Sequence, residues 1–195
     1  GGNLRAILTE EEGKTIQYWD LKAQEIIGTI DITAEETNVP LFGNEAEGCV
    51  IDDENEHIII SREGMRGILN AYDANTLEFI KVIDSRSGNI GGDPEGVTIY
   101  KTSDKEGFII LSSQGDSKFN LYNRQFPFDY VKSFTVNDVS DTDGIDVTNK
   151  AIDDLYTQGF LVVQDGYNSP DNQNFKIIDM EQVLKKKVKN PGSID

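Results

Sequence analysis

The chain has 195 residues, of which 35 are acidic and 18 basic, giving a formal net charge of −17. Such an acidic chain is a poor partner for nucleic acid, because phosphate backbones are bound by basic surfaces. A single cysteine and a single histidine exclude a disulfide within the chain and a zinc site of the usual ligand set. No apolar run approaches the roughly 20 residues of a membrane-spanning helix, so no membrane span is expected.

Short apolar segments separated by turn residues predict strands along most of the chain. The first three are expected at residues 5–8, 15–21 and 25–32. Two groups of four follow, at 48–51, 57–61, 67–72 and 77–83, and at 97–101, 108–112, 119–123 and 130–136. The last strands are expected at 145–148, 160–164 and 175–179, followed by the one predicted helix, at 180–189.

Four glycines that close apolar runs recur at intervals of 51 residues, at Gly13, Gly64, Gly115 and Gly166. Each follows a short polar stretch at the end of a segment with the pattern of a strand. A period of about 40–50 residues is the size of one four-stranded blade of a β-propeller. The series therefore predicts a repeated supersecondary unit of this kind.

A second series, with intervals of 48 residues, consists of the pairs Glu47-Gly48, Glu95-Gly96 and Asp143-Gly144. The chain contains seven Glu-Gly or Asp-Gly pairs, so one matching interval would carry little weight. Two interleaved series, both next to predicted strands, are stronger evidence of a structural repeat. Together they predict an all-β chain that forms a β-propeller of four-stranded antiparallel blades.

The length limits how many blades the chain can form. Propellers have about four to eight blades, and at about 50 residues for each blade the chain supplies roughly four. The first three predicted strands also match the second to fourth strands of a blade. We therefore expect residues 1–195 to be a single, partial propeller domain, and a complete small propeller is the alternative.

The repeated carboxylates Glu47, Glu95 and Asp143 are the best candidates for a functional site. Equivalent positions of successive blades face one central axis, so these side chains are expected to form a ring at one mouth of the channel. Like charges at such a site repel unless cations bind or their pKa values rise. A hard cation such as Ca²⁺ suits carboxylate ligands. The alternative is that acidic-glycine pairs are ordinary turns leading into strands.

Six motifs follow one another in the chain: AEG (46–48) before Asp52-Asp53, DPEGVTIY (93–100), LSSQG (111–115), SDTDGIDV (140–147), VQDG (163–166) and NQNFK (172–176). In this order they resemble the β-propeller phytases, calcium-dependent enzymes with six blades. The resemblance covers most of the chain and corresponds to the later portion of the six-bladed domain. DPEGVTIY and SDTDGIDV are its most specific parts.

The resemblance implies a calcium-rich active site at one mouth of the channel, lined by Glu47, Glu63, Asp93, Glu95 and Asp143. Of these, Asp93, Glu95, Glu47 and Asp143 would be the catalytic residues. Several Ca²⁺ ions would bind phytate or a related phosphate ester, and a metal-bound water would attack phosphorus.

A second calcium site is also implied by the resemblance. Asp165 and Asn168 match the region that binds a structural calcium in the family. The resemblance further implies an extracytoplasmic protein, whether secreted, periplasmic or attached to the cell surface.

One departure from the family leaves a second hypothesis open. Glu11 stands where the family has a lysine that helps to hold substrate phosphate, and a carboxylate there would weaken phosphate binding. The alternative function is a catalytically impaired, phytase-like propeller that acts as a calcium-stabilised binding or scaffold module. Outside the predicted site, Cys49 is expected to be a buried free thiol and His57 a surface residue. The oligomeric state is left open.

Overall fold

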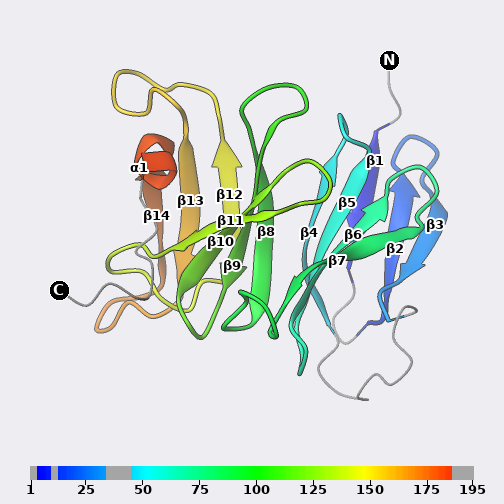
Figure 1. Cartoon of the computed structure of the whole chain (residues 1–195), viewed down its shortest axis with the longest axis horizontal. Coiled ribbons are helices and arrows are strands. Elements are labelled where there is room, and N and C mark those ends of the chain that lie inside the picture. Colours follow the sequence, from blue (N-terminus) through cyan, green and yellow to red (C-terminus); the bar gives the residue numbers. More distant parts are fainter. Residues whose placement is uncertain (1–3, 10–12, 34–44, 186–195) are drawn as a thin grey trace.

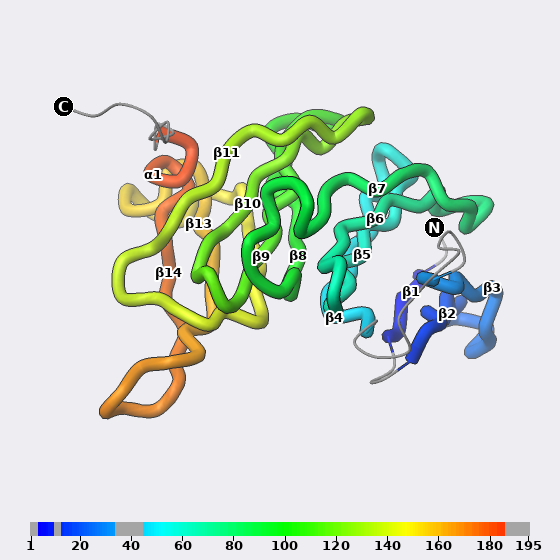
Figure 2. The backbone as a smooth tube through the Cα atoms, turned by 60° about the horizontal axis from the view of Figure 1, so that its bottom comes forward, coloured from blue at the N-terminus to red at the C-terminus, as the bar shows by residue number. Residues whose placement is uncertain are grey.

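The computed structural model describes residues 4–9, 13–33 and 45–185. These residues form four antiparallel sheets, with strand orders β1-β2-β3, β4-β5-β6-β7, β11-β10-β9-β8 and β12-β13-β14. The sheets follow one another in chain order, as Figures 1 and 2 show, and each corresponds to one blade. The prediction of an all-β, propeller-like chain is confirmed. The first and last described sheets have three strands and the two between them have four, as the predicted groups of strands require.

The strands, in chain order, are β1 (Arg5–Leu8), β2 (Thr15–Asp20), β3 (Glu25–Asp31), β4 (Ala46–Asp52), β5 (His57–Arg62), β6 (Ile68–Asp73), β7 (Phe79–Ser85), β8 (Pro94–Lys101), β9 (Gly107–Ser113), β10 (Lys118–Asn123), β11 (Tyr130–Phe134), β12 (Ile145–Thr148), β13 (Phe160–Asp165) and β14 (Asn174–Asp179). Every predicted strand has a counterpart, and the largest difference is that β8 begins at Pro94 instead of 97. The helix α1 spans Met180–Lys185, and the rest of the predicted helix lies outside the described residues. None of the helices described here is long and apolar enough to cross a membrane.

The second strand of each four-stranded blade is buried on both faces. In β5 the consecutive residues Ile58, Ile59 and Ile60 are almost completely buried. Ile58 and Ile60 belong to the apolar cluster shared with the first sheet, whereas Ile59 belongs to the cluster shared with the third sheet. Side chains alternate between the faces of a strand. An uninterrupted apolar run is therefore what a strand packed between two neighbouring blades requires.

The innermost strands β4, β8 and β12 lie beside one another, and glycines allow their close approach. A Cβ atom on Gly48 would lie 2.5 Å from the carbonyl oxygen of Glu95, and one on Gly96 would collide with the carbonyl oxygen of Asp143. The Gly96 N–H donates a hydrogen bond of 2.8 Å to that same Asp143 oxygen. The 48-residue series thus records the positions at which neighbouring inner strands touch.

Gly144, the third glycine of that series, provides a matched control for this packing. A Cβ atom there would have no other atom within 4 Å. We predict that Gly96→Ala lowers the free energy of unfolding by about 1–3 kcal/mol, because the backbone must move to relieve the overlap. Gly144→Ala should leave it within about 0.5 kcal/mol of wild type. Urea unfolding of both variants measures this, and equal effects would show that the inner strands do not depend on the glycine.

At the opposite end of the inner strands, a buried arginine joins the second and third sheets. Arg124, which follows β10, donates from Nε to Oδ2 of Asp52 at 2.7 Å and from Nη2 to Oε2 of Glu54 at 2.6 Å. Its Nη1 donates to the carbonyl oxygen of Asp104 at 3.0 Å. Burial by itself would raise the pKa of Asp52, but hydrogen bonds from Arg124 and Asn55 more than offset it and lower that pKa.

This lowered pKa predicts how acid affects stability. Because the folded-state pKa of Asp52 lies below its unfolded value of about 3.9, its stabilising effect is present above that value and is lost as the pH falls through the folded pKa. We expect Asp52→Asn to be less stable than wild type at pH 6 and to lose less stability on acidification. Thermal unfolding from pH 6 to pH 2 tests this, and parallel curves for the two proteins would contradict it.

Candidate functional site

The carboxylates of the 48-residue series converge where the inner strands begin. Glu47 lies in β4, Glu95 in β8, and Asp143 two residues before β12. Glu95 is only 8% exposed. Burial, followed by the negative charges of Glu47 and Glu63 and then of Asp143, raises the pKa of Glu95 to about 7. Four of the predicted site residues therefore interact electrostatically at one mouth of the propeller.

The densest part of this site is on the second sheet. One carboxylate oxygen from each of Glu45, Glu47 and Glu63 lies within 4.8 Å of the others. Removal of water from around the carboxyl group, followed by the charges of Glu63 and Glu45, raises the pKa of Glu47. The carboxyl groups of Glu47 and Glu95 also interact with each other. Burial and neighbouring negative charges thus both disfavour the ionised forms of Glu47 and Glu95.

These residues fit a hard divalent cation. All the converging donors are carboxylate oxygens, the ligand type that Ca²⁺ prefers. A cation among them would offset both the burial and the mutual repulsion that raise the pKa values of Glu47 and Glu95. Glu45, Glu47 and Glu63 are the residues best placed to hold it, with Glu95 beside them.

Glu45 was not among the residues predicted from sequence. It precedes Glu47 by two residues, the same offset that separates Asp93 from Glu95. This repeated offset was available as a signal. In the structure the Glu63 N–H donates to the carbonyl oxygen of Glu45 at 2.9 Å, which fixes the two residues next to each other.

Asp93 has a different environment from the other predicted ligands. Its Oδ1 pairs with Nη2 of Arg86, and the two side chains are 32% and 31% exposed. The Nε of Arg86 also donates to the carbonyl oxygen of Gly64 at 3.1 Å. The chain therefore already provides a positive charge for Asp93.

Asp143 is held by amide side chains that the sequence analysis did not assign to the site. Nε2 of Gln114 donates to Oδ1 of Asp143. The Asp143 N–H donates to Oε1 of Gln164 at 2.9 Å, and Nε2 of Gln164 donates to Oε1 of Gln173 at 3.2 Å. Gln114 directly follows β9, as Glu63 directly follows β5, whereas Gln164 lies within β13. At the position of Glu63 the third sheet therefore has a neutral amide.

Asp165 and Asn168, the residues predicted for a structural calcium, have separate partners. Asp165 is 1% exposed, accepts a hydrogen bond from the Ser140 N–H at 3.2 Å and has Oδ2 3.4 Å from Nζ of Lys176. Nδ2 of Asn168 donates to the carbonyl oxygen of Asn172 at 3.0 Å. In the part of the chain that the structure describes, no group of three acidic ligands includes Asp165. A calcium site here stays a prediction.

The remaining residues singled out from sequence lie away from this mouth. His57, expected at the surface, is partly exposed, and its ring packs edge-to-face on Phe128 with a centroid distance of 5.0 Å. In the sheet it lies opposite Asp52, at the other end of the inner strand from Glu47. Cys49 is a free thiol that is half-buried instead of fully buried. Glu11 lies outside the described residues.

Comparisons with known proteins identify the family. The sequence profile described as Phytase matches residues 1–194. The chain belongs to the phytase family. It is 33% identical over 196 residues to a 3-phytase of Bacillus subtilis (strain 168), and the match covers 93% of this chain and 50% of the relative. The chain thus spans about half the length of this curated relative.

Solved structures support the fold of this phytase-family chain. A chain of the nidogen/laminin complex superposes with a TM-score of 0.64 at 10% identity, covering 91% of this chain and 58% of the other. The WD40 repeats of RRP9 superpose with a TM-score of 0.54 at 10% identity, covering 88% of this chain and 47% of the other. At such low identity the likeness concerns the architecture alone.

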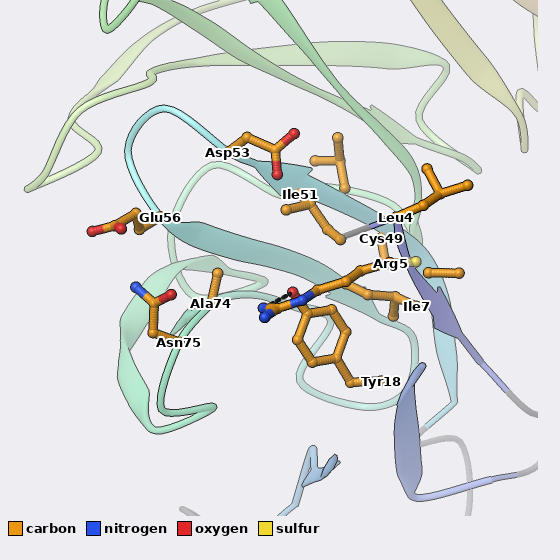
Figure 3. A pocket seen from close by; sticks show the side chains of 12 residues that line it. Leu4, Arg5, Ile7, Tyr18, Cys49, Ile51, Asp53, Glu56, Ala74 and Asn75 are labelled. Carbon is orange, nitrogen blue, oxygen red and sulfur yellow. Dashed lines mark hydrogen bonds between the residues drawn. The ribbon is translucent and has the colours of Figure 1, made fainter. Parts of the chain in front are cut away.

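A groove of about 680 Å³ lies between the first two sheets and is separate from the carboxylate site. Figure 3 shows its lining, with side chains from β1, β2 and β4. Nη1 of Arg5 donates to the Tyr18 hydroxyl across it at 3.1 Å. Ile7, Cys49 and Ile51 form part of its apolar surface. None of the converging carboxylates lines this groove. The volume of a groove is therefore no guide to the position of the carboxylate site.

Cation binding at the carboxylate mouth predicts a change in thermal stability. A ligand that binds only the folded protein stabilises it by about 1.4 kcal/mol for each tenfold excess over its Kd. We expect Ca²⁺ to raise the Tm, and Glu63→Gln to reduce that rise, because it removes one of the three clustered carboxylates. Glu78→Gln, at an exposed position before β7, is the control. Equal calcium responses of all three proteins would contradict this assignment.

Proposed function

We propose that this chain is part of a calcium-dependent phosphohydrolase that releases phosphate from phytate or a related phosphate ester. The observation that carries the proposal is the convergence of Glu47, Glu63, Glu95 and Asp143 at one mouth of a phytase-family propeller. The similarity to a 3-phytase supports the substrate class. Because the chain spans half of that relative, the activity is proposed for the full-length protein.

An acidic mouth suits an anionic substrate only when cations bind there. Phytate carries many phosphate groups, and uncompensated carboxylates would repel it. Bound Ca²⁺ is the largest local charge of such a site and reverses its sign. The chemistry that Ca²⁺ would supply is neutralisation of charge on the phosphate and activation of a water molecule.

The residues of this chain have distinct parts in the proposed reaction. Glu45, Glu47 and Glu63 hold cations, because their carboxylate oxygens already lie close together. Buried Glu95 lies close enough to Glu47 and Glu63 for their charges to raise its pKa, and it would add a further ligand once ionised. Asp143 keeps its orientation through Gln114. The touching inner strands fix the spacing of these groups.

A second candidate function is a calcium-stabilised binding or scaffold module without catalysis. The pairing of Asp93 with Arg86 favours it, because one predicted ligand is already neutralised by the chain itself. This alternative predicts stabilisation by Ca²⁺ without phosphate release. An extracytoplasmic location is proposed for either function, since weaker calcium sites fill at the millimolar concentrations found outside cells.

Substitution of Glu95 separates the two candidates. In the full-length protein, Glu95→Gln should lower kcat/KM for phytate by about 100-fold or more, in the range that results when one electrostatic contact to the transition state is removed. Glu78→Gln should behave like wild type. Phosphate release with and without EGTA measures both effects. Phosphate release that is unchanged in EGTA would refute the calcium mechanism, and none from wild type in Ca²⁺ would favour the scaffold module.

A further inference from the structure

Arg86 is held in one position at the rim of the carboxylate mouth. It directly follows β7, and its backbone N–H donates to the carbonyl oxygens of Arg66 at 2.9 Å and Gly67 at 3.1 Å. The Nε donates to the carbonyl oxygen of Gly64 at 3.1 Å. Backbone and guanidinium are therefore both tied to the loop that follows Glu63.

Gly67 leaves the space that the Arg86 side chain fills. A Cβ atom on Gly67 would lie 2.9 Å from Cγ and 3.0 Å from Nε of Arg86. Gly67 also has a φ of +44°, a conformation that residues with a side chain rarely adopt. The loop is thus shaped to let the arginine pass along it, beside Pro94 at the start of β8.

The guanidinium of Arg86 keeps donors available. Arginine has five N–H groups, and the structure gives one bond from Nε to Gly64 and one from Nη2 to Asp93. Within residues 4–9, 13–33 and 45–185, the remaining N–H groups have no acceptor. The side chain is 31% exposed, so solvent reaches part of it. The guanidinium lies between Gly64, next to Glu63, and Asp93, two residues before Glu95.

We propose that Arg86 is a phosphate-binding residue of this mouth. This inference rests on the proposed function, and it assigns to Arg86 the binding of a phosphate group of the substrate. The planar guanidinium matches two phosphate oxygens, which a lysine cannot do. The partly exposed ion pair with Asp93 adds little to stability, so stability alone does not account for so constrained an arginine.

The ion pair between Arg86 and Asp93 also couples the binding of phosphate to the binding of Ca²⁺. While Asp93 accepts from Nη2, part of the guanidinium is occupied. A cation that takes Asp93 as a ligand frees this donor for phosphate. Phosphate should therefore bind more tightly in the presence of Ca²⁺, and Ca²⁺ more tightly in the presence of phosphate, because such coupling is reciprocal.

The test compares Arg86→Met, Arg86→Lys and wild type in the full-length protein, with Lys22→Met, an exposed lysine in the β2–β3 turn, as the control. Titration calorimetry gives the Kd of inorganic phosphate with and without Ca²⁺. We expect Arg86→Met to weaken phosphate binding in Ca²⁺ by about 10–100-fold, the loss of a charge-assisted hydrogen bond. Arg86→Lys should retain part of the affinity, and Lys22→Met all of it.

Kinetics on phytate give the second measurement. Arg86→Met should raise KM more than it lowers kcat, whereas terbium luminescence should show cation affinity no weaker than in wild type, since Asp93 is released. A phosphate Kd and KM equal to wild type would overturn the proposal. If Arg86→Met does not fold, Arg86→Lys decides by the same criterion: a wild-type Kd overturns the proposal and a weakened one supports it.

The same data separate this inference from the proposed function. Wild-type protein that hydrolyses phytate while Arg86→Met keeps its KM and phosphate Kd refutes the role of Arg86 alone. Arginine-dependent phosphate binding without hydrolysis by wild type refutes the proposed function and leaves the phosphate site standing. Wild-type protein that binds no phosphate in Ca²⁺ overturns the role of Arg86 whatever its activity.

Discussion

Contact between neighbouring inner strands is the constraint on which both the sheets and the carboxylates depend. Gly48 lies against the backbone of Glu95, and Gly96 against the backbone of Asp143. Each glycine directly follows an acidic residue of the 48-residue series. The packing that brings the strands together therefore brings the carboxylates together as well. The same acidic-glycine pair therefore contributes a glycine to strand packing and a carboxylate to the candidate site.

The carboxylates at the two ends of the inner strands have opposite electrostatic environments. At one end Asp52 and Glu54 are neutralised by Arg124 and Lys101, and the pKa of Asp52 falls. At the other end the carboxylates face one another, and the pKa values of Glu47 and Glu95 rise. The first end links adjacent blades within the chain. At the second end, burial and like charges together disfavour ionised carboxylates, and a bound cation would offset both.

The sequence predicted the strands well because each blade strand has a local pattern, and the two periodic series located equivalent positions. The series and the family resemblance together predicted Glu47, Glu63, Glu95 and Asp143 for one mouth, and in the structure the charges of the other three act on Glu95. Glu45 was missed, although its offset was visible. The pairs Arg86–Asp93 and Gln114–Asp143 could not be found this way, because they join residues whose side-chain directions depend on how segments pack. Sequence periodicity identifies equivalent positions in successive blades. The contacts between individual side chains can be identified only from the three-dimensional structure.

The groove beside β1 has a consequence for work on the protein in solution. β1 pairs with β2 on one side, and within the described residues its other edge has no strand partner. An open edge of this kind offers a row of backbone donors and acceptors to any extended chain. We therefore expect self-association through this edge wherever no other segment covers it. Light scattering at several concentrations would distinguish that behaviour from any effect of added cations.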